Sequence, residues 1–229
     1  MAEPFGGALA SNASCCAATF YGGIMSDRQK PAPAAVPIHE LIANRWSPRA
    51  FESRGVEPEK LRRLFEAARW AASSYNAQPW YFIVGLENEP ENFKKILDCF
   101  VAINQGWAKN APVVALSVAG LKMPHDGSTN RHAFHDVGQA AATLALQATA
   151  LGLQVHQMAG IVPDKAREIF AIPADYEAVA GFAIGYPGDP LTLPEGRFRD
   201  AETGGRQRKP VSSFVFTGKW GETLPLVVK

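Results

Sequence analysis

Three side chains in one short turn, Arg45, Ser47 and Arg49, offer hydrogen-bond donors that could hold a single anion. A guanidinium presents a planar fork of N–H groups that matches phosphate oxygens, and a serine hydroxyl adds one more donor. Alternate residues of an extended segment point the same way, so the three side chains could converge on one phosphate. A solvated surface turn with two incidental cations is the simpler interpretation of this stretch taken alone.

Two other stretches carry similar chemistry. Arg208 and Lys209 form a basic pair directly before Pro210, far away in the chain. By themselves they are better explained as surface charge than as a site. The segment "ASSYNAQPWYF", residues 72–82, places serine and asparagine side chains and free backbone amides between an expected helix and an expected strand.

The chain lacks the common signatures of phosphate loops and metal sites. It contains no GxGxxG after a strand, no GxxxxGK[ST] and no HExxH. His132, His135 and Asp136 have a spacing that a metal could use on a helix, but no third protein ligand is evident. A polar first turn, with Asp136 favoured by the helix dipole, explains them without a metal. We therefore predict no metal site.

The elements that position these residues alternate along the chain. Apolar residues that recur three or four positions apart, with Pro or Gly at the ends of the segment, predict helices. Short runs of consecutive apolar residues predict buried strands. The expected helices cover 38–44, 56–73, one or two within 90–110, 134–151 and 163–170, and the expected strands cover 81–86, 111–120, 178–187 and 210–218. This interleaving predicts a layered α/β or α+β domain, with a polar charged loop at 188–209.

Composition excludes several classes of function. The net charge is +1, the hydrophobic share 47% and the charged share 20%. These values give no electrostatic case for nucleic acid or an anionic membrane, and no apolar run approaches the roughly 20 residues of a membrane helix. The cysteines, Cys15, Cys16 and Cys99, form no metal or disulfide pattern, which favours a reducing, cytoplasmic location. Residues 1–36, rich in Ala, Gly, Ser and Pro, are expected to be a disordered leader.

Two features predict self-association. Gly138, Ala142 and Ala145 give the long helix a second face of small residues, which would allow another backbone to approach closely. The chain ends in an apolar segment, 218–229, that includes Trp220 and would be a liability if nothing covered it. A disordered tail is the alternative.

Six segments, in this order, resemble the nitroreductase family of flavin enzymes over about 36–216. They are the turn Arg45, Ser47, Arg49 and Phe51; the loop Ser73, Ser74, Asn76, Gln78, Pro79, Trp80 and Phe82; the Gly/Ala-rich helix 135–151; the stretch "HQMAGI"; the strand end Gly185, Tyr186 and Pro187; and the basic Arg208, Lys209 and Pro210.

The resemblance implies a fold and an assembly. The fold would be α+β, a nitroreductase-like three-layer α/β/α sandwich whose mixed central sheet is flanked by helices. Residues 37–217 would form the FMN-binding domain. The chain would be an obligate homodimer with a swapped C-terminal extension, in which 218–229 pack on the partner subunit.

The resemblance also assigns a cofactor and its contacts. FMN would lie at the dimer interface, with NAD(P)H as reductant. The flavin phosphate, ribityl chain and ring would be contacted by residues from four of these segments. They are the turn, the loop (in many members supplied by the partner), the stretch "HQMAGI" and the basic pair. The contacting residues are Arg45, Ser47, Arg49, Ala72, Ser73, Ser74, Asn76, Gln78, Met158, Ala159, Gly160, Arg208 and Lys209.

The expected reaction is a ping-pong reduction of nitroaromatics, quinones or related small acceptors, with the chemistry carried by the flavin and no catalytic side chain. A non-catalytic flavin store or sensor on the same scaffold is one alternative. Another is a different flavin reaction, for instance reductive dehalogenation, enoyl reduction or flavin fragmentation, although members of that kind usually add a lid and none is evident here. One departure bears on this choice: well-known members have Pro and Glu before the glycine matching Gly160, where this chain has Gln157 and Ala159.

Overall fold

The computed structural model describes residues 29–228 and contains a four-stranded sheet of order β1-β2-β4-β3. The strands are β1 (Trp80–Leu86), β2 (Val113–Gly120), β3 (Gln154–Met158) and β4 (Tyr176–Gly185). Every neighbouring pair is antiparallel. The α+β class is therefore confirmed, but the expected mixed sheet is not found among the described residues. Buried apolar runs identify strands without giving their direction, and the linkers here return each strand antiparallel to its neighbour.

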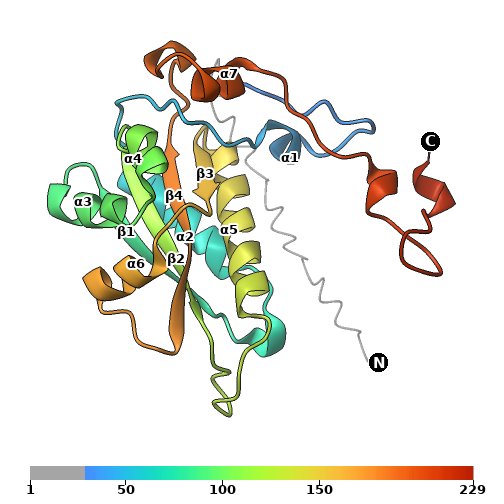
Figure 1. The fold of residues 1–229 in the computed structure, drawn as a ribbon, viewed down its shortest axis with the longest axis horizontal. Coiled ribbons are helices and arrows are strands. Elements are labelled where there is room, and N and C mark those ends of the chain that lie inside the picture. Colours follow the sequence, from blue (N-terminus) through green and yellow to red (C-terminus); the bar gives the residue numbers. More distant parts are fainter. Residues whose placement is uncertain (1–28, 229) are drawn as a thin grey trace, which may run out of the picture.

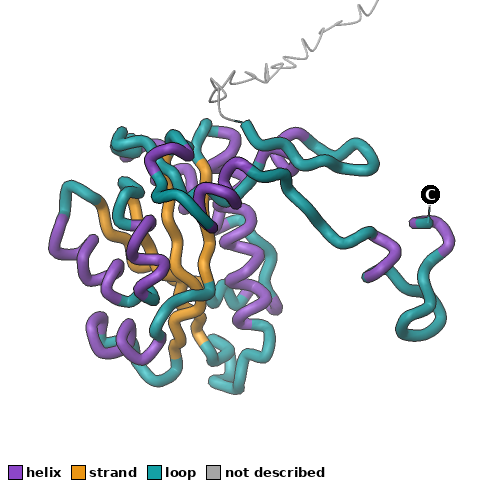
Figure 2. Tube along the Cα trace, turned by 45° about the horizontal axis from the view of Figure 1, so that its top comes forward, coloured by secondary structure: helices purple, strands orange, loops and turns teal. Residues whose placement is uncertain are grey.

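Helices cover both faces of this sheet (Figure 1). On one face lie α3 (Pro90–Asp98), α4 (Ala102–Ala108) and α6 (Pro163–Phe170); on the other lie α2 (Pro58–Arg69) and α5 (Ala133–Ala150). Figure 2 shows the same layers from another angle. The three-layer α/β/α arrangement is thus present, with two helical layers around one sheet.

Strand β2 explains why both faces must be covered. All eight of its residues are buried. Val114 and Leu116 pack in the core under α3 and α4, whereas Val113 and Ala115 pack in the core under α2 and α5. Alternate side chains of a strand point to opposite faces, so an entirely apolar strand requires a layer on each side.

The small-residue face of α5 is divided between the core and the surface. Ala145 is buried in the core shared with α2. Gly138 and Ala142 lie on the exposed outer face, and a Cβ added at Gly138 would meet no atom within 4 Å. Two of the three residues expected to allow a close approach are therefore accessible.

The short helices α1 (Glu40–Asn44) and α7 (Arg197–Thr203) lie outside the layers, as does the 3-10 turn η2 (Pro190–Thr192). Figure 1 shows α1 and α7 together at one end of the sheet, where the C-terminal end of α5 also lies. No helix among residues 29–228 is long and apolar enough to cross a membrane.

The C-terminal residues form an arm that leaves the body (Figures 1 and 2). The strand predicted over 210–218 is wrong: Val211–Ser213 is a 3-10 turn, and the chain then folds back on itself through an isolated bridge between Phe216 and Thr223. The local pairing is completed by Thr217 N–H donating to the Glu222 carbonyl at 2.8 Å. A short apolar run needs a free sheet edge to become a strand, and none lies beside this arm in the described part of the chain.

Residues 29–36 are part of the expected disordered leader, but in the structure they pack on the body of the domain. Ala32 N–H donates to the carbonyl of Ala43 at 2.8 Å, and the Lys30 ammonium donates to two carbonyls of α7, those of Ala201 and Glu202. The remainder of the expected leader, 1–28, lies outside the described residues.

Candidate functional site

The turn that carries Arg45 begins where α1 ends. Arg45 is the C-cap of that helix, with φ −65° and ψ 124°, and its N–H donates to the carbonyl of Leu41 at 3.0 Å. Pro48 disfavours helical backbone at the residue before it, so the chain continues in an extended form. This geometry directs the side chains of Arg45 and Ser47 into one cleft, where Arg45 Nη1 lies 3.4 Å from Ser47 Oγ.

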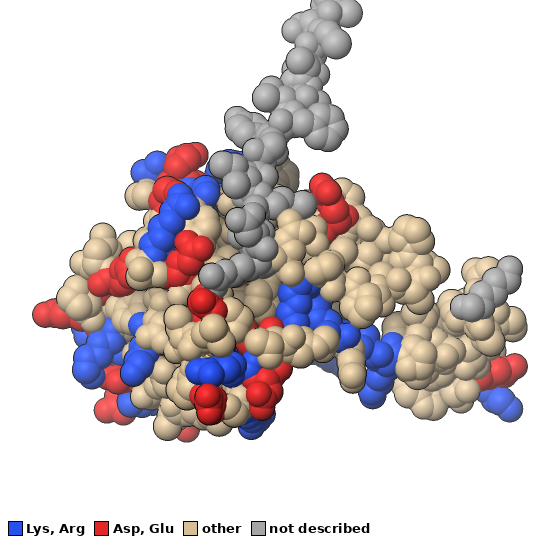
Figure 3. All heavy atoms as spheres, turned by 90° about the horizontal axis from the view of Figure 1, so that it is seen from above, with Lys and Arg blue, Asp and Glu red and all other residues tan. Residues whose placement is uncertain are grey.

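The cleft is small and strongly basic. Its volume is 180 Å³, and its lining includes Lys30, Arg45, Ser47, Arg206 and Arg208. Arg45 and Arg208 are thus brought together although they are far apart in the sequence. Figure 3 shows Lys and Arg side chains gathered where the C-terminal arm leaves the body.

The cations of this cleft repel one another. Burial lowers the pKa of Arg45, and the charge of Arg208 lowers it further. The pKa of Arg206 is lowered by burial, then by Arg45 and Arg208. Arginine remains charged at any ordinary pH, so these directions report an accumulation of positive charge rather than a titration. A bound anion, above all a phosphate dianion, would relieve that repulsion.

Arg206 is a residue that the sequence analysis missed. Its Nη1 donates to the carbonyls of Lys30 (2.8 Å) and Ala43 (2.6 Å), so it joins the N-terminal segment to α1 as well as lining the cleft. Arg206 lies two residues before Arg208 in an extended stretch, and alternate residues of such a stretch share a face. This spacing could have predicted that both arginines line the same cleft.

Arg49 does not follow the prediction that it converges with Arg45 and Ser47. Its guanidinium carbon lies 5.1 Å from the ring centre of Phe198 on α7 and 5.8 Å from that of Trp107 on α4. Arg49 is absent from the lining of the basic cleft, and its buried Nε has no hydrogen-bond partner among the described residues. The backbone fixes this direction, because the Arg49 and Ala50 N–H groups both donate to the buried carboxylate of Glu202.

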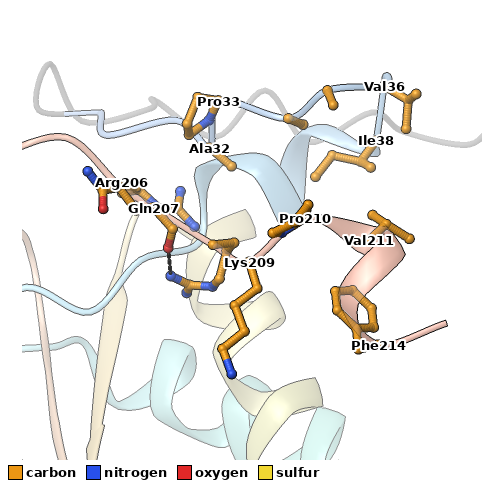
Figure 4. A pocket seen from close by; sticks show the side chains of 13 residues that line it. Ala32, Pro33, Val36, Ile38, Arg206, Gln207, Lys209, Pro210, Val211 and Phe214 are labelled. Carbon is orange, nitrogen blue, oxygen red and sulfur yellow. Dashed lines mark hydrogen bonds between the residues drawn. The ribbon is translucent and has the colours of Figure 1, made fainter. Parts of the chain in front are cut away.

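Lys209 also takes a different direction from Arg208. It lines a larger, mostly apolar groove of 960 Å³ between residues 32–38 and the start of the arm. Figure 4 shows its side chain pointing away from the 32–38 segment, while Val211 and Phe214 follow on the arm. Arg208 lines both the basic cleft and this groove, whereas Lys209 lines the groove and not the cleft.

The loop that contains Ala72, Ser73, Ser74, Asn76 and Gln78 lies at the opposite end of α5. Ser74 N–H donates to Asp136 Oδ2 in the first turn of that helix at 2.9 Å, and His135 Nδ1 lies 2.9 Å from Asp136 Oδ1. These contacts explain the polar cluster at the start of α5 without a metal. With 18 residues at about 1.5 Å each, α5 is about 27 Å long, and the loop and the basic cleft lie at its opposite ends within one chain.

This loop is conformationally strained. Tyr75, Asn76 and Gln78 have φ values of 51°, 53° and 47°, although none of them is glycine. Ser73 Oγ supports the shape by accepting the Gln78 N–H at 3.1 Å. Positive φ in three residues of one exposed loop is unusual, and such strain concentrates at functional sites.

Met158 is the last residue of β3, and Ala159 and Gly160 follow it next to α4. Met158 is buried and Ala159 is exposed. The Gly160 carbonyl accepts from the Val101 N–H (3.0 Å) and from Asn104 Nδ2 (3.1 Å). A Cβ at position 160 would lie 2.4 Å from that nitrogen, so close packing accounts for the glycine.

The fold and the cleft together define a class: a three-layer α+β protein with a basic cleft at one end of its sheet. A family model described as the nitroreductase family matches residues 42–186, which is more than half of the chain. The chain belongs to the nitroreductase family.

Individual relatives agree with this assignment. A protein of Archaeoglobus fulgidus, provisionally named NADH dehydrogenase/NAD(P)H nitroreductase, is 28% identical over 66% of this chain and 85% of its own length. A Mycolicibacterium smegmatis protein without an assigned function is 33% identical over 43% of this chain, a match that spans 66% of that protein. A crystal structure described as an oxidoreductase containing FMN has 32% identity and a TM-score of 0.78, covering 84% of this chain and 97% of that one. A nitroreductase family protein from Clostridium difficile 630 has 29% identity and a TM-score of 0.61, covering 80% and 99%.

Proposed function

We propose that this protein is a cytoplasmic FMN-dependent oxidoreductase that uses NAD(P)H to reduce nitroaromatics, quinones or related acceptors. In the ping-pong mechanism, the reductant and the acceptor occupy the same site in turn. The basic cleft formed by Arg45, Ser47 and Arg208 is the observation that carries the proposal. It offers two guanidinium forks and a hydroxyl to one phosphate, and the relatives include an oxidoreductase containing FMN and an NAD(P)H nitroreductase.

The residues present fit the flavin phosphate. The cleft concentrates positive charge that Arg45, Arg206 and Arg208 do not neutralise for one another. Arg206 Nη1 is shared between two backbone carbonyls, and Arg208 Nη1 donates to the carbonyl of Gln207 at 2.7 Å. In this proposal the remaining N–H groups of Arg45 and Arg208 bind the phosphate directly. Lys209, which points elsewhere, contributes at most to the local potential.

The orphaned Nε of Arg49 marks a second polar position near the flavin. Arg49 is a candidate partner for the polar edge of the ring, as the resemblance implies, once its side chain turns from Phe198. Met158, Ala159 and Gly160 are proposed to lie along the ring. FMN, when bound, supplies the hydride chemistry, while these residues orient it and exclude water.

The flavin site needs a second copy of the chain. The strained loop and the basic cleft lie at opposite ends of α5, so one chain cannot place both on one flavin. Two chains packed through antiparallel α5 helices would bring the loop of each to the cleft of the other. Gly138 and Ala142 on the outer face of α5, and Phe134 at 47% exposure, suit such packing.

The arm supports the same assembly. Trp220 is 92% exposed and Phe214 is 61% exposed on a segment that stands off the body. We propose that residues 37–217 form the flavin-binding domain and that 218–229 pack on the partner subunit. The arm would then cover apolar surface that neither chain covers alone.

The test is the visible spectrum followed by rapid reduction. The purified protein, supplied with FMN, should be yellow, should bleach when mixed with NADH or NADPH, and should recover its colour when a quinone or nitroaromatic is added. A protein that binds FMN but is not reduced by either nucleotide would be the non-catalytic store or sensor. The absence of a carboxylate at Gln157 and Ala159 makes that comparison necessary. A protein that takes up no FMN would contradict the proposal.

A further inference from the structure

The backbone of the cationic turn is held by a side chain of β3 rather than by a neighbouring strand. Gln154 Oε1 accepts the N–H of Trp46 at 3.1 Å, and Gln154 Nε2 donates to the carbonyl of Asn44 at 3.2 Å. One buried amide therefore satisfies backbone groups on both sides of Arg45. Thr149 Oγ1 lies 3.4 Å from the same Oε1, which fixes the orientation of the amide.

A second side chain of β3 extends this clamp. His156 Nδ1 lies 2.9 Å from the carbonyl of Pro48, and a carbonyl only accepts, so Nδ1 carries the proton. The imidazole is buried and packs on Trp107, with ring centres 4.5 Å apart. Residues 154 and 156 are two apart on one strand, so both face the same side of the sheet.

The spacing of the clamped groups matters for the cleft. Asn44, Trp46 and Pro48 are anchored through their backbone by the two side chains. The intervening residues, Arg45 and Ser47, both line the basic cleft. Anchoring every second residue of an extended segment fixes the direction of the side chains between them, which is the condition for two donors to meet one phosphate.

We propose that Gln154 and His156 are positioning residues that hold the turn 44–48 in its phosphate-binding shape. The proposal rests on the proposed flavin function and deepens it. Neither side chain lines the basic cleft, so each acts through Arg45 and Ser47. The two residues together form a clamp that replaces a β ladder at a point where Pro48 has no N–H to contribute.

The test compares FMN with riboflavin, which lacks the phosphate. The dissociation constant of riboflavin divided by that of FMN is a ratio that isolates phosphate recognition. A general loss of stability or of ring binding weakens the binding of both ligands alike and leaves this ratio unchanged. Gln154→Met keeps the side-chain volume and removes both hydrogen bonds, and it should lower the ratio about ten-fold. His156→Phe should act in the same direction. His156→Asn, which can place an N–H close to the position of Nδ1, should restore most of the ratio.

Ser117→Ala is the matched control, because Ser117 is a buried residue of β2 whose hydroxyl donates to the Ala180 carbonyl away from the turn. It should change thermal stability without changing the ratio. A double-mutant cycle adds a second readout: on an Arg45→Ala background, Gln154→Met should cause little further loss. If Gln154→Met does not fold, the His156→Phe and His156→Asn pair carries the test.

The outcomes separate the two proposals. A wild-type protein that prefers FMN, with variants that keep the full preference, overturns the positioning role alone. Equal losses in His156→Phe and His156→Asn would also overturn it for His156. A wild-type protein that binds neither flavin overturns the proposed function, and the positioning role with it.

Discussion

Acidification should destabilise this protein through His156. Burial, followed by the charge of Arg49, lowers the pKa of His156 to about 4 from an ordinary value of 6.5. The imidazole also faces Arg45, whose charge lowers the pKa further. Contacts with the backbone of Ser47 and Pro48 raise the pKa, but they offset only part of the lowering.

The sign follows from the direction of this shift. The folded state favours the neutral imidazole, so the unfolded state binds the proton more readily between pH 6.5 and about 4. The contribution of the neutral His156 to the free energy of unfolding is therefore fully present above this window and is lost as the pH falls through it. A pKa lowered from 6.5 to about 4, at about 1.36 kcal/mol per pH unit, corresponds to a loss of about 3 kcal/mol in the free energy of unfolding.

The assay is urea unfolding of the wild type and of His156→Asn at a series of pH values across this window. Other titrating groups contribute to both proteins, including Glu57, whose pKa a hydrogen bond from Tyr186 lowers to about 2. The difference between the two curves therefore reports His156. The wild type should lose about 3 kcal/mol more than the variant as pH falls. Parallel curves would refute the reasoning, because they would mean that the buried imidazole titrates normally.

Other predictions concern the site and the assembly. Arg45→Ala should weaken FMN binding by about 1–3 kcal/mol without changing riboflavin binding, whereas Lys209→Ala should change FMN binding much less; fluorescence titration measures both. Deleting 218–229 should shift the protein from dimer toward monomer in light scattering after gel filtration, and an unchanged dimer would show that the arm is dispensable. Gly160→Ala should lower the free energy of unfolding by about 1–3 kcal/mol in a denaturant titration, because its Cβ would meet Asn104; wild-type stability would indicate that the neighbour moves aside.

Much of the fold was predictable because apolar patterns dominate it. The long helix, the short helix after 163 and the three apolar strands all appeared near their expected positions. The helix α7 was hidden in a polar stretch, since its single buried residue is Glu202, which gives no apolar periodicity. The false strand at 210–218 shows the converse: a short apolar run on a free arm has no sheet edge to join.

The site was predictable only in part. The association of Arg45 with Arg208 came from the family resemblance, since no spacing rule joins residues that are so far apart. Gln154 and His156 were missed because they act on backbone groups, which leave no signature in the side chains of the turn. The direction of Arg49 could not be foreseen because it depends on Glu202 in an element that the pattern did not reveal.

The central claim is that Arg45, Ser47 and Arg208 bind the phosphate of FMN. The most direct measurement is a titration of the flavin-free wild-type protein with FMN and with riboflavin under identical conditions. Two charge-assisted contacts should give FMN a preference of about 100-fold or more, and the preference should shrink as salt is added. Equal affinity for the two flavins would contradict the claim.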